Sequence, residues 1–159
     1  MITLWTGLLG KFSSTRAQAL FDRVDELLRS RLEVAGSLSK IEISGELIYS
    51  SAILPMFYER RDYRPAWSDD AGPKRLVDDL IFAISSADLE GLRPADYHFE
   101  RMKAILTDIR HHRALKLPLN PARLADLDLL ASDTFLIYGS HLLAGRINPE
   151  TIDPEWIAN

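Results

Sequence analysis

The feature that most constrains the fold is a long, densely apolar segment at residues 121–144. Asn120 followed by Pro121 is a typical helix start, because the Asn side chain can cap the first turn and proline there costs no hydrogen bond. Gly145 is a typical stop. Its apolar residues are Leu124, Leu127, Leu129, Leu130, Phe135, Leu136, Ile137, Leu142 and Leu143. A helix that is apolar on most faces needs cover on most faces, so we predict that it is the centre of a bundle.

The remaining chain offers several amphipathic helices to surround it. Residues 15–35, 74–89 and 99–115 show apolar side chains at helical spacing, and glycines follow the first two. Residues 46–61 predict one interrupted helix or two short ones, with Pro55 in a first turn capped by Ser50 or Ser51. Before them, residues 37–44 predict a brief extended piece that leads straight into this helix. Residues 62–73 predict a loop.

The fold class that follows is all-α, a single compact bundle of five to six helices around the hydrophobic C-terminal helix, with irregular loops. We assign residues 15–159 to this domain and residues 1–14 to an N-terminal extension. The extension is apolar, but no basic residue precedes its apolar part, as one does in a secretion signal. The tail at residues 146–159 is rich in turn residues and contains a late tryptophan, which suggests a segment that runs onward.

Composition excludes several classes of function. Lys and Arg number 19 against 23 Asp and Glu, with no long basic run, which disfavours nucleic-acid binding. No segment approaches the ~20 apolar residues of a membrane span. The chain has no cysteine, so thiolate metal sites, disulfides and cysteine catalysis are impossible within it. Phosphate-binding glycine motifs are absent, and we expect no cofactor.

Acidic and histidine side chains offer no convincing catalytic or metal site. The acidic pairs are Asp69 with Asp70, Asp78 with Asp79, and Asp126 with Asp128. We expect these pairs on solvated turns and helix faces, since a catalytic carboxyl needs burial. The histidines are His98, His111, His112 and His141, and we interpret them as surface or packing residues. Ser140 and His141 are adjacent, but a catalytic triad also needs an acid and convergence in space.

Aromatic and arginine side chains gather in the predicted loop. Tyr63, Arg64 and Trp67 are the most prominent, and such side chains can anchor a partner or line a carbohydrate groove. The alternative is that Tyr63 and Trp67 fold inward and plug the end of the bundle. Solvent exposure of the indole distinguishes the two.

Three ordered segments suggest a family. They are LPMFYERRDYRPAWSD at residues 54–69, SSADLEGLRPADYH at residues 85–98, and LDLLASDTFLIY at residues 127–138, the last followed by GRINP at residues 145–149. Together they resemble the N-terminal region of large bacterial L,D-transpeptidases, over about residues 48–156. In those murein cross-linking enzymes a helical scaffold precedes a peptidoglycan-binding module and a catalytic domain.

The resemblance implies a noncatalytic scaffold domain in the periplasm or cell envelope. The family's nucleophile lies in a Ser-His-Gly-Cys motif, whereas Ser140-His141 is followed by Leu142. The implied partners are the peptidoglycan-binding and catalytic domains of the same protein, with contacts at Tyr63, Arg64, Trp67, Arg146 and Asn148. The alternative function is a murein or glycan-binding module that uses the Tyr63–Trp67 loop.

Overall fold

A computed structural model describes the backbone of residues 6–35 and 40–144, and the side chains of residues 18–33 and 40–144. The predicted stop at Gly145 and the predicted contact residues Arg146 and Asn148 lie outside these residues. In chain order the elements are α1 (Thr6–Ala35), β1 (Ile41–Ile43), β2 (Glu46–Ile48), α2 (Leu54–Glu59), β3 (Ser68–Asp69), β4 (Gly72–Pro73), α3 (Arg75–Ser85), the 3₁₀ helices η1 (Ala87–Glu90) and η2 (Pro94–Tyr97), α4 (Phe99–Ala114) and α5 (Pro121–Ala144).

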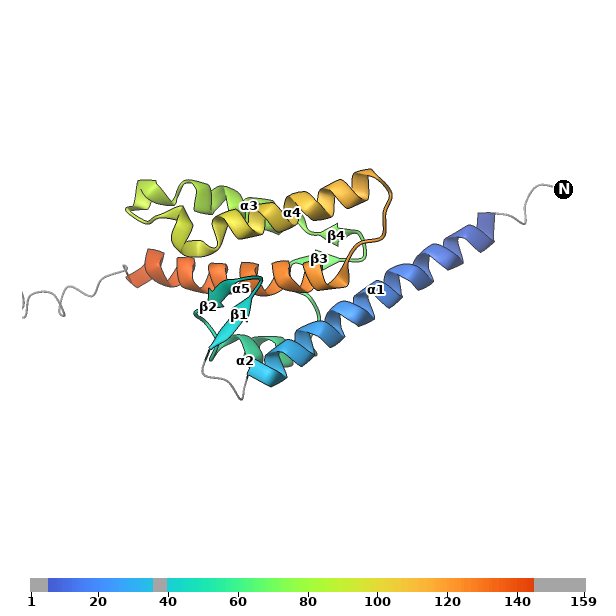
Figure 1. Ribbon diagram of the computed structural model, residues 1–159, viewed down its shortest axis with the longest axis horizontal. Helices are drawn as coiled ribbons and strands as arrows, with labels where there is room; N and C mark the ends of the chain where they lie inside the picture. Colours follow the sequence, from blue (N-terminus) through green and yellow to red (C-terminus); the bar gives the residue numbers. More distant parts are fainter. Residues whose placement is uncertain (1–5, 36–39, 145–159) are drawn as a thin grey trace, which may run out of the picture.

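Helix α5 lies in the middle of the molecule, between two groups of elements (Figure 1). Helices α3 and α4 pack along one side, while α1, α2 and the β1–β2 hairpin lie on the other. The strands form only two small antiparallel pairs, β1 with β2 and β3 with β4. The predicted all-α class is therefore confirmed. No helix among the described residues is long and apolar enough to cross a membrane.

The start of α5 follows the sequence closely. Asn120 Oδ1 accepts a hydrogen bond of 2.9 Å from the backbone N–H of Ala122, which caps the first turn as predicted. From Leu124 to Thr134 every residue is buried. The core around this half includes Val24 and Leu28 of α1. The prediction of a central helix is thus confirmed for the first half of α5.

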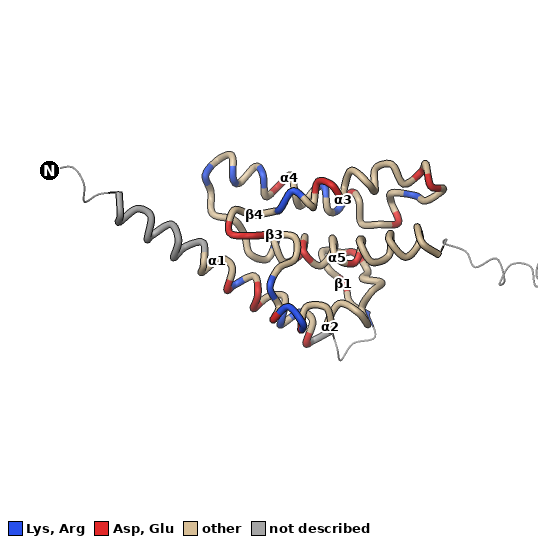
Figure 2. The backbone as a smooth tube through the Cα atoms, turned by 180° about the vertical axis from the view of Figure 1, so that it is seen from behind, with Lys and Arg blue, Asp and Glu red and all other residues tan. Residues whose placement is uncertain are grey.

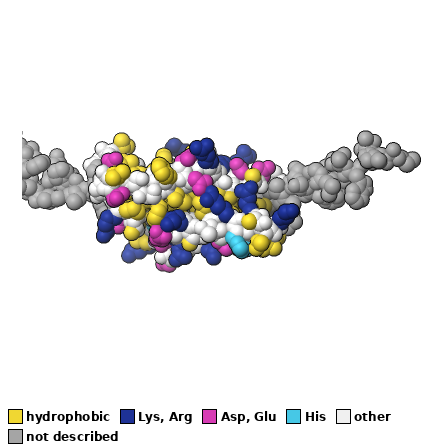
Figure 3. Space-filling model, turned by 90° about the horizontal axis from the view of Figure 1, so that it is seen from above, with side chains coloured by type: hydrophobic (Ala, Val, Ile, Leu, Met, Phe, Trp, Pro, Cys, Tyr) yellow, Lys and Arg dark blue, Asp and Glu magenta, His cyan; other side chains and the backbone are white. Residues whose placement is uncertain are grey.

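The second half of α5 is less covered than predicted. The Phe135 side chain is 58% exposed, Leu142 is 47% exposed and Leu143 is 92% exposed. The prediction that α5 is covered on most sides is therefore wrong for this half, within the described residues. Seen from above, the molecule shows hydrophobic side chains on the surface between charged ones (Figure 3).

The segment before α2 differs from the predicted helix. Ile43 pairs with Glu46 across a turn formed by Ser44 and Gly45, whose φ angles are 52° and 84°. Positive φ at both central residues is typical of a tight hairpin turn, and glycine adopts it without strain. The extended piece at Ile41 is confirmed, but the expectations that it leads straight into a helix and that residues 46–48 are helical are wrong.

Other helix boundaries differ from the predicted ones. Helix α1 begins at Thr6 rather than at the predicted residue 15. Pro55 does lie in the first turn of α2, but Ile53 rather than a serine occupies the cap position. The Ser50 backbone carbonyl accepts hydrogen bonds from the N–H groups of Ile53 and Leu54, at 2.9 and 3.0 Å. The predicted helix at residues 74–89 divides into α3 and η1, and Gly91, with φ of 71°, closes η1.

Candidate functional site

A buried carboxylate on α5 is the centre of the strongest polar cluster. Asp128 is fully buried, and its Oδ1 accepts hydrogen bonds from the Tyr58 hydroxyl and the Ala66 N–H, both at 2.7 Å. Its Oδ2 accepts from the Trp67 N–H at 3.0 Å and from the Ser68 hydroxyl at 3.2 Å. Four donors from α2 and the following loop therefore converge on one side chain.

The same cluster continues through Ser132, one turn further along α5. The Trp67 indole Nε1 donates to Ser132 Oγ at 2.8 Å, and Ser132 Oγ lies 2.7 Å from the Tyr58 hydroxyl oxygen. Since Tyr58 donates its only proton to Asp128, Ser132 donates to Tyr58. The indole, the two hydroxyls and the carboxylate thus form one continuous chain of hydrogen bonds.

The protonation states follow from these contacts. Burial raises the pKa of Asp128, and hydrogen bonds from Tyr58, Ala66, Trp67 and Ser68 oppose that rise. All four partners donate, so the ionised carboxylate fits the site without an unpaired proton. Burial, and then the charge of Asp128, raise the pKa of Tyr58 well above its ordinary value. The phenol therefore stays protonated and serves as a donor.

A second carboxylate, Asp133, holds the segment between β2 and α2. The Asp133 carboxylate accepts hydrogen bonds from the backbone N–H groups of Ser50 at 2.6 Å and of Tyr49 at 3.2 Å. Its Oδ2 lies 2.8 Å from His98 Nε2. His98 Nδ1 lies 3.1 Å from Glu46. Burial lowers the pKa of His98, but the hydrogen bonds and charges of Asp133 and Glu46 outweigh it, so the pKa is raised overall.

A third carboxylate, Asp126, joins α1 and the hairpin turn to α5. Its Oδ2 accepts from the Ser44 hydroxyl at 2.7 Å, and its Oδ1 forms an ion pair with Arg31 at 2.6 Å. The prediction that Asp126 and Asp128 lie on a solvated helix face is wrong, because both are buried where loop backbone and α1 need acceptors. The sequence signal for this was three acids inside an otherwise apolar helix.

These clusters are structural in character. The hydrogen-bonding positions of Asp128 are occupied by protein donors, which leaves no free base beside a substrate-sized space. His141 Nδ1 lies 2.9 Å from the Tyr97 hydroxyl, so it packs rather than joining Ser140 in a triad. Within residues 18–33 and 40–144, no group of three or more His, Asp or Glu side chains could hold a metal ion.

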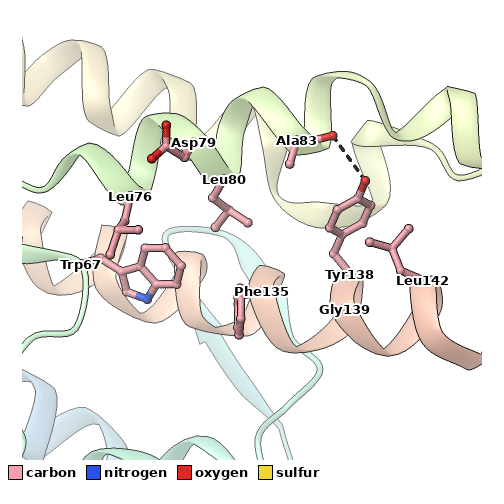
Figure 4. Close-up of a pocket in the computed structure, with 9 residues that line it drawn as sticks. All are labelled: Trp67, Leu76, Asp79, Leu80, Ala83, Phe135, Tyr138, Gly139 and Leu142. Carbon is pink, nitrogen blue, oxygen red and sulfur yellow. Dashed lines mark hydrogen bonds between the residues drawn. The ribbon is translucent and has the colours of Figure 1, made fainter.

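An apolar groove lies beside the Asp128 cluster, between α3 and α5 (Figure 4). It has a volume of about 320 Å³. Its lining residues are Trp67, Leu76, Asp79, Leu80, Ala83, Phe135, Tyr138, Gly139 and Leu142. A smaller hollow of about 140 Å³ adjoins it, and Trp67 and Phe135 line both. Their ring centroids lie 5.9 Å apart with the planes at 60°.

A family model described as a scaffold domain matches residues 52–159. This chain belongs to the scaffold-domain family. The match includes all of α2 to α5 and so includes every partner of Asp128. Comparison with curated proteins gives no match, and neither does comparison with solved structures.

The scaffold domain separates the loop residues that the sequence groups together. Tyr63 is half-buried against α1, where the Arg29 guanidinium lies 4.6 Å from the centre of its ring. Arg64 is exposed. The Trp67 indole N–H points inward and donates to Ser132, while the ring lines the groove. The indole is therefore half-buried, between the fully buried and the fully exposed positions that the two alternatives predict. Tyr63 and Trp67 pack on different helices and do not form one aromatic surface.

Basic and acidic residues are both spread along the backbone of the protein (Figure 2). Basic residues are prominent near α2 and the loop after it, and acidic residues lie among them. Arg29 pairs with Asp62 at 3.4 Å in this region, and both side chains are at least half exposed. Exposed pairs of this kind contribute little to stability.

Proposed function

We propose that this scaffold domain is a noncatalytic part of an L,D-transpeptidase that acts in peptidoglycan cross-linking and cell-wall biogenesis. In this role it positions the peptidoglycan-binding and catalytic domains of the same protein in the periplasm or cell envelope. Membership in the scaffold-domain family supports the noncatalytic role. The three sequence segments that resemble L,D-transpeptidases support the identity of the parent enzyme.

The observation that carries the proposal is that these three segments contact one another inside the protein. Asp128, from the third segment, accepts hydrogen bonds from Tyr58 and Trp67 of the first. Asp133, also from the third, contacts His98 of the second at 2.8 Å. The motif residues are thus used to join elements that are far apart in the sequence. This use is typical of a rigid frame rather than of an active site.

Rigidity is the property that such a frame needs. Three carboxylates on one helix hold α1, the hairpin, α2 and two loops, so these elements keep fixed positions relative to α5. Cysteine transpeptidation needs a thiolate beside a base, and this chain has no cysteine. In this proposal the transpeptidation reaction therefore takes place in another domain. Arg64 in the loop, and the exposed side chains Leu47, Tyr49, Ile53 and Met56, are available as domain contacts.

The alternative function, a murein or glycan-binding module, has weaker support. Sugar recognition combines an aromatic face with hydrogen-bonding groups placed around it. The indole N–H of Trp67 already donates to Ser132, and the groove beside it is lined mainly by apolar side chains. The Tyr63 ring is covered by Arg29 on one face.

The cellular test is to remove residues 52–144 in frame from the chromosomal gene and to measure the muropeptides of the cell wall. We expect the share of L,D-cross-links to fall. Arg64→Glu, at the proposed domain contact, should lower it in part, while Arg75→Glu on the exposed surface of α3 serves as the matched control. An unchanged share of L,D-cross-links after the deletion would overturn the proposed parent enzyme.

Binding to purified sacculi distinguishes the alternative. We expect neither the wild-type chain nor Trp67→Ala to sediment with peptidoglycan, after circular dichroism has shown that both are folded. Sedimentation of the wild type that is lost in a folded Trp67→Ala variant would instead support glycan binding at the groove.

A further inference from the structure

His98 lies at the junction of three elements, the β1–β2 hairpin, α4 and α5. Its side chain is 2% exposed, and each ring nitrogen faces a carboxylate. Nδ1 lies 3.1 Å from Glu46 Oε2 on β2, and Nε2 lies 2.8 Å from Asp133 Oδ2 on α5. The His98 backbone enters α4 with a φ of 53°, in the left-handed region that residues other than glycine rarely adopt. One ring therefore joins residues that are 52 and 35 positions away in the sequence.

The two contacts together require a protonated ring. An ionised carboxylate only accepts hydrogen bonds, and a neutral imidazole has a single N–H. A neutral His98 can therefore donate to Glu46 or to Asp133, but not to both. Only the imidazolium, which has an N–H on each nitrogen, satisfies the two carboxylates at once.

The two carboxylates differ in how much they depend on His98. Asp133 is fully buried, so it loses more than an exposed acid would if a donor were withdrawn. The Glu46 side chain is 36% exposed, and Arg101 lies 4.0 Å from its Oε1. Water can hydrate Glu46 when His98 does not bind it. A neutral imidazole is thus expected to keep its one N–H on Asp133 and to release Glu46.

We propose that His98 is a pH-sensitive latch on the β1–β2 hairpin. The imidazolium holds the hairpin against α4 and α5 through Glu46, and loss of its proton releases Glu46 and loosens the hairpin beside α5 (Figure 1). Leu47 and Tyr49, which follow Glu46, are 39% and 64% exposed, so the latch sets how firmly this part of the surface is held. The inference does not depend on the identity of the parent enzyme.

The groups around His98 give the latch its direction. Glu46 comes from β2, Asp133 from α5, and the Tyr49 ring, from the segment after β2, stacks at 6.1 Å. On α4, Arg101 reaches Glu46. Burial lowers the pKa of His98, but the hydrogen bonds and charges of Asp133 and Glu46 raise it overall above the ordinary value of 6.5. The latch is therefore closed below pH 6.5 and opens as the pH rises through the higher folded pKa.

Amide hydrogen exchange in the full chain tests the latch, because it reports local opening along the backbone. Protection factors, which are corrected for the intrinsic pH dependence of exchange, are compared at about pH 5.5 and about pH 9. The amides of residues 41–48 report on the hairpin. The amides of Ala66 and Trp67, which bind Asp128 on the same helix, are the internal control.

We expect the protection of the hairpin amides to fall about tenfold from the lower to the higher pH, because a hydrogen bond between two charged groups is lost. Protection at Ala66 and Trp67 should stay constant. Constant protection of the hairpin would overturn the proposal, since a neutral His98 would then hold it equally well. An equal fall at Ala66 and Trp67 would also overturn it, because the whole chain would then be opening.

Glu46→Gln assigns the effect to the latch. The Gln amide can accept from a protonated Nδ1 and can donate to a neutral one, so this variant should hold the hairpin equally at both pH values. Glu42→Gln is the matched control, because Glu42 is an exposed acid on the same hairpin, and it should keep the tenfold fall. Circular dichroism establishes that both variants are folded. An undiminished fall in folded Glu46→Gln would overturn the proposal.

Discussion

The two halves of α5 are similar in hydrophobicity but opposite in environment. Between Leu124 and Thr134 every side chain is buried, including the carboxylates of Asp126, Asp128 and Asp133. Beyond Thr134 the helix carries no acid, yet Phe135, Leu142 and Leu143 are exposed. Three acids of this helix are thus buried together with its leucines, while three of its large apolar side chains are exposed, although acids are usually on the surface.

The difference shows that unpaired backbone groups decide which polar side chains are buried. The chain around Tyr49 and Ser50, and the loop at Ala66 and Trp67, pass close to the first half of α5 with N–H groups that need acceptors. Asp133 and Asp128 supply those acceptors. The second half lines the groove beside α3 and contacts Tyr97 through Tyr138 and His141, and it carries no carboxylate.

Removing the Asp128 carboxylate is expected to have the largest effect. Asp128→Ala leaves the partly buried Ala66 and Trp67 N–H groups without their acceptor, and it leaves the buried Tyr58 hydroxyl only the backbone carbonyl of residue 128, at 3.0 Å. We expect the free energy of unfolding to fall by about 3–5 kcal/mol, in the range for breaking a buried charged network. Urea denaturation followed by circular dichroism measures it.

Asp79→Ala is the matched control for that substitution, since its carboxylate is 57% exposed and has only a weak contact with Arg75 at 3.7 Å. It should change the free energy of unfolding by less than about 0.5 kcal/mol. Similar losses at the two positions would mean that water replaces the Asp128 carboxylate, and the contrast between the halves of α5 would then have another cause.

Two leucines on α5 compare apolar burial in the same helix. Leu130 is fully buried in the first half, whereas Leu143 is 92% exposed in the second. We expect Leu130→Ala to lower the free energy of unfolding by about 2–4 kcal/mol, because it creates a cavity. Leu143→Ala should change it by less than about 0.5 kcal/mol. The same urea denaturation measures both, and a large loss at Leu143 would show that the second half is covered in solution.

The sequence predicts the fold class and the central position of the first half of α5, but not its exposed second half or the buried carboxylates. Helical periodicity, the Asn120 cap and Pro121 are local signals, so α3, α4 and α5 could be predicted to within a few residues. The hairpin could also have been found from Ser44-Gly45 between alternating isoleucines. The prediction of one interrupted helix or two short ones over residues 46–61 leaves no room for this hairpin.

The carboxylate network could not be predicted in the same way. Asp128 and Ala66 are 62 positions apart, and their contact depends on how a loop without regular structure packs on α5. Hydropathy treats each Asp as a surface residue, since it does not register which backbone groups lack partners. The loop residues were likewise grouped by closeness in sequence, although the fold directs Tyr63 to α1 and Trp67 to α5.

Removing one hydroxyl from the network is expected to have an intermediate effect. Tyr58→Phe keeps the ring but removes the bonds to Asp128 and Ser132, both at 2.7 Å. We expect a loss of about 1–2 kcal/mol in the free energy of unfolding. Tyr138→Phe is the counterpart in the second half, where the hydroxyl makes a longer bond of 3.3 Å to the Ala83 carbonyl. Tyr138→Phe should lower the free energy of unfolding by less than Tyr58→Phe does. Equal losses would contradict the proposed difference between the two halves of α5.

The contact of His98 with Asp133, near the middle of α5, should make the stability of the protein depend on pH. Its pKa in the folded protein is raised above the ordinary value of 6.5, because contacts with Asp133 and Glu46 outweigh burial. The stabilisation by the imidazolium is therefore fully present below pH 6.5 and is lost as the pH rises through the higher folded pKa. We expect the stability difference between wild type and His98→Gln to decrease from pH 5.5 toward alkaline pH, as measured by urea denaturation at each pH. A difference that grows with pH would contradict this assignment.

The smallest expected change, and one of opposite sign, is at Gly139 in the second half. Glycine inside a helix is less favourable than alanine by about 0.5–1 kcal/mol, and an added Cβ here meets no atom within 4 Å. Gly139→Ala should therefore raise the free energy of unfolding by about that amount if the groove floor is open. A loss of stability would instead show that other side chains cover the groove floor in solution.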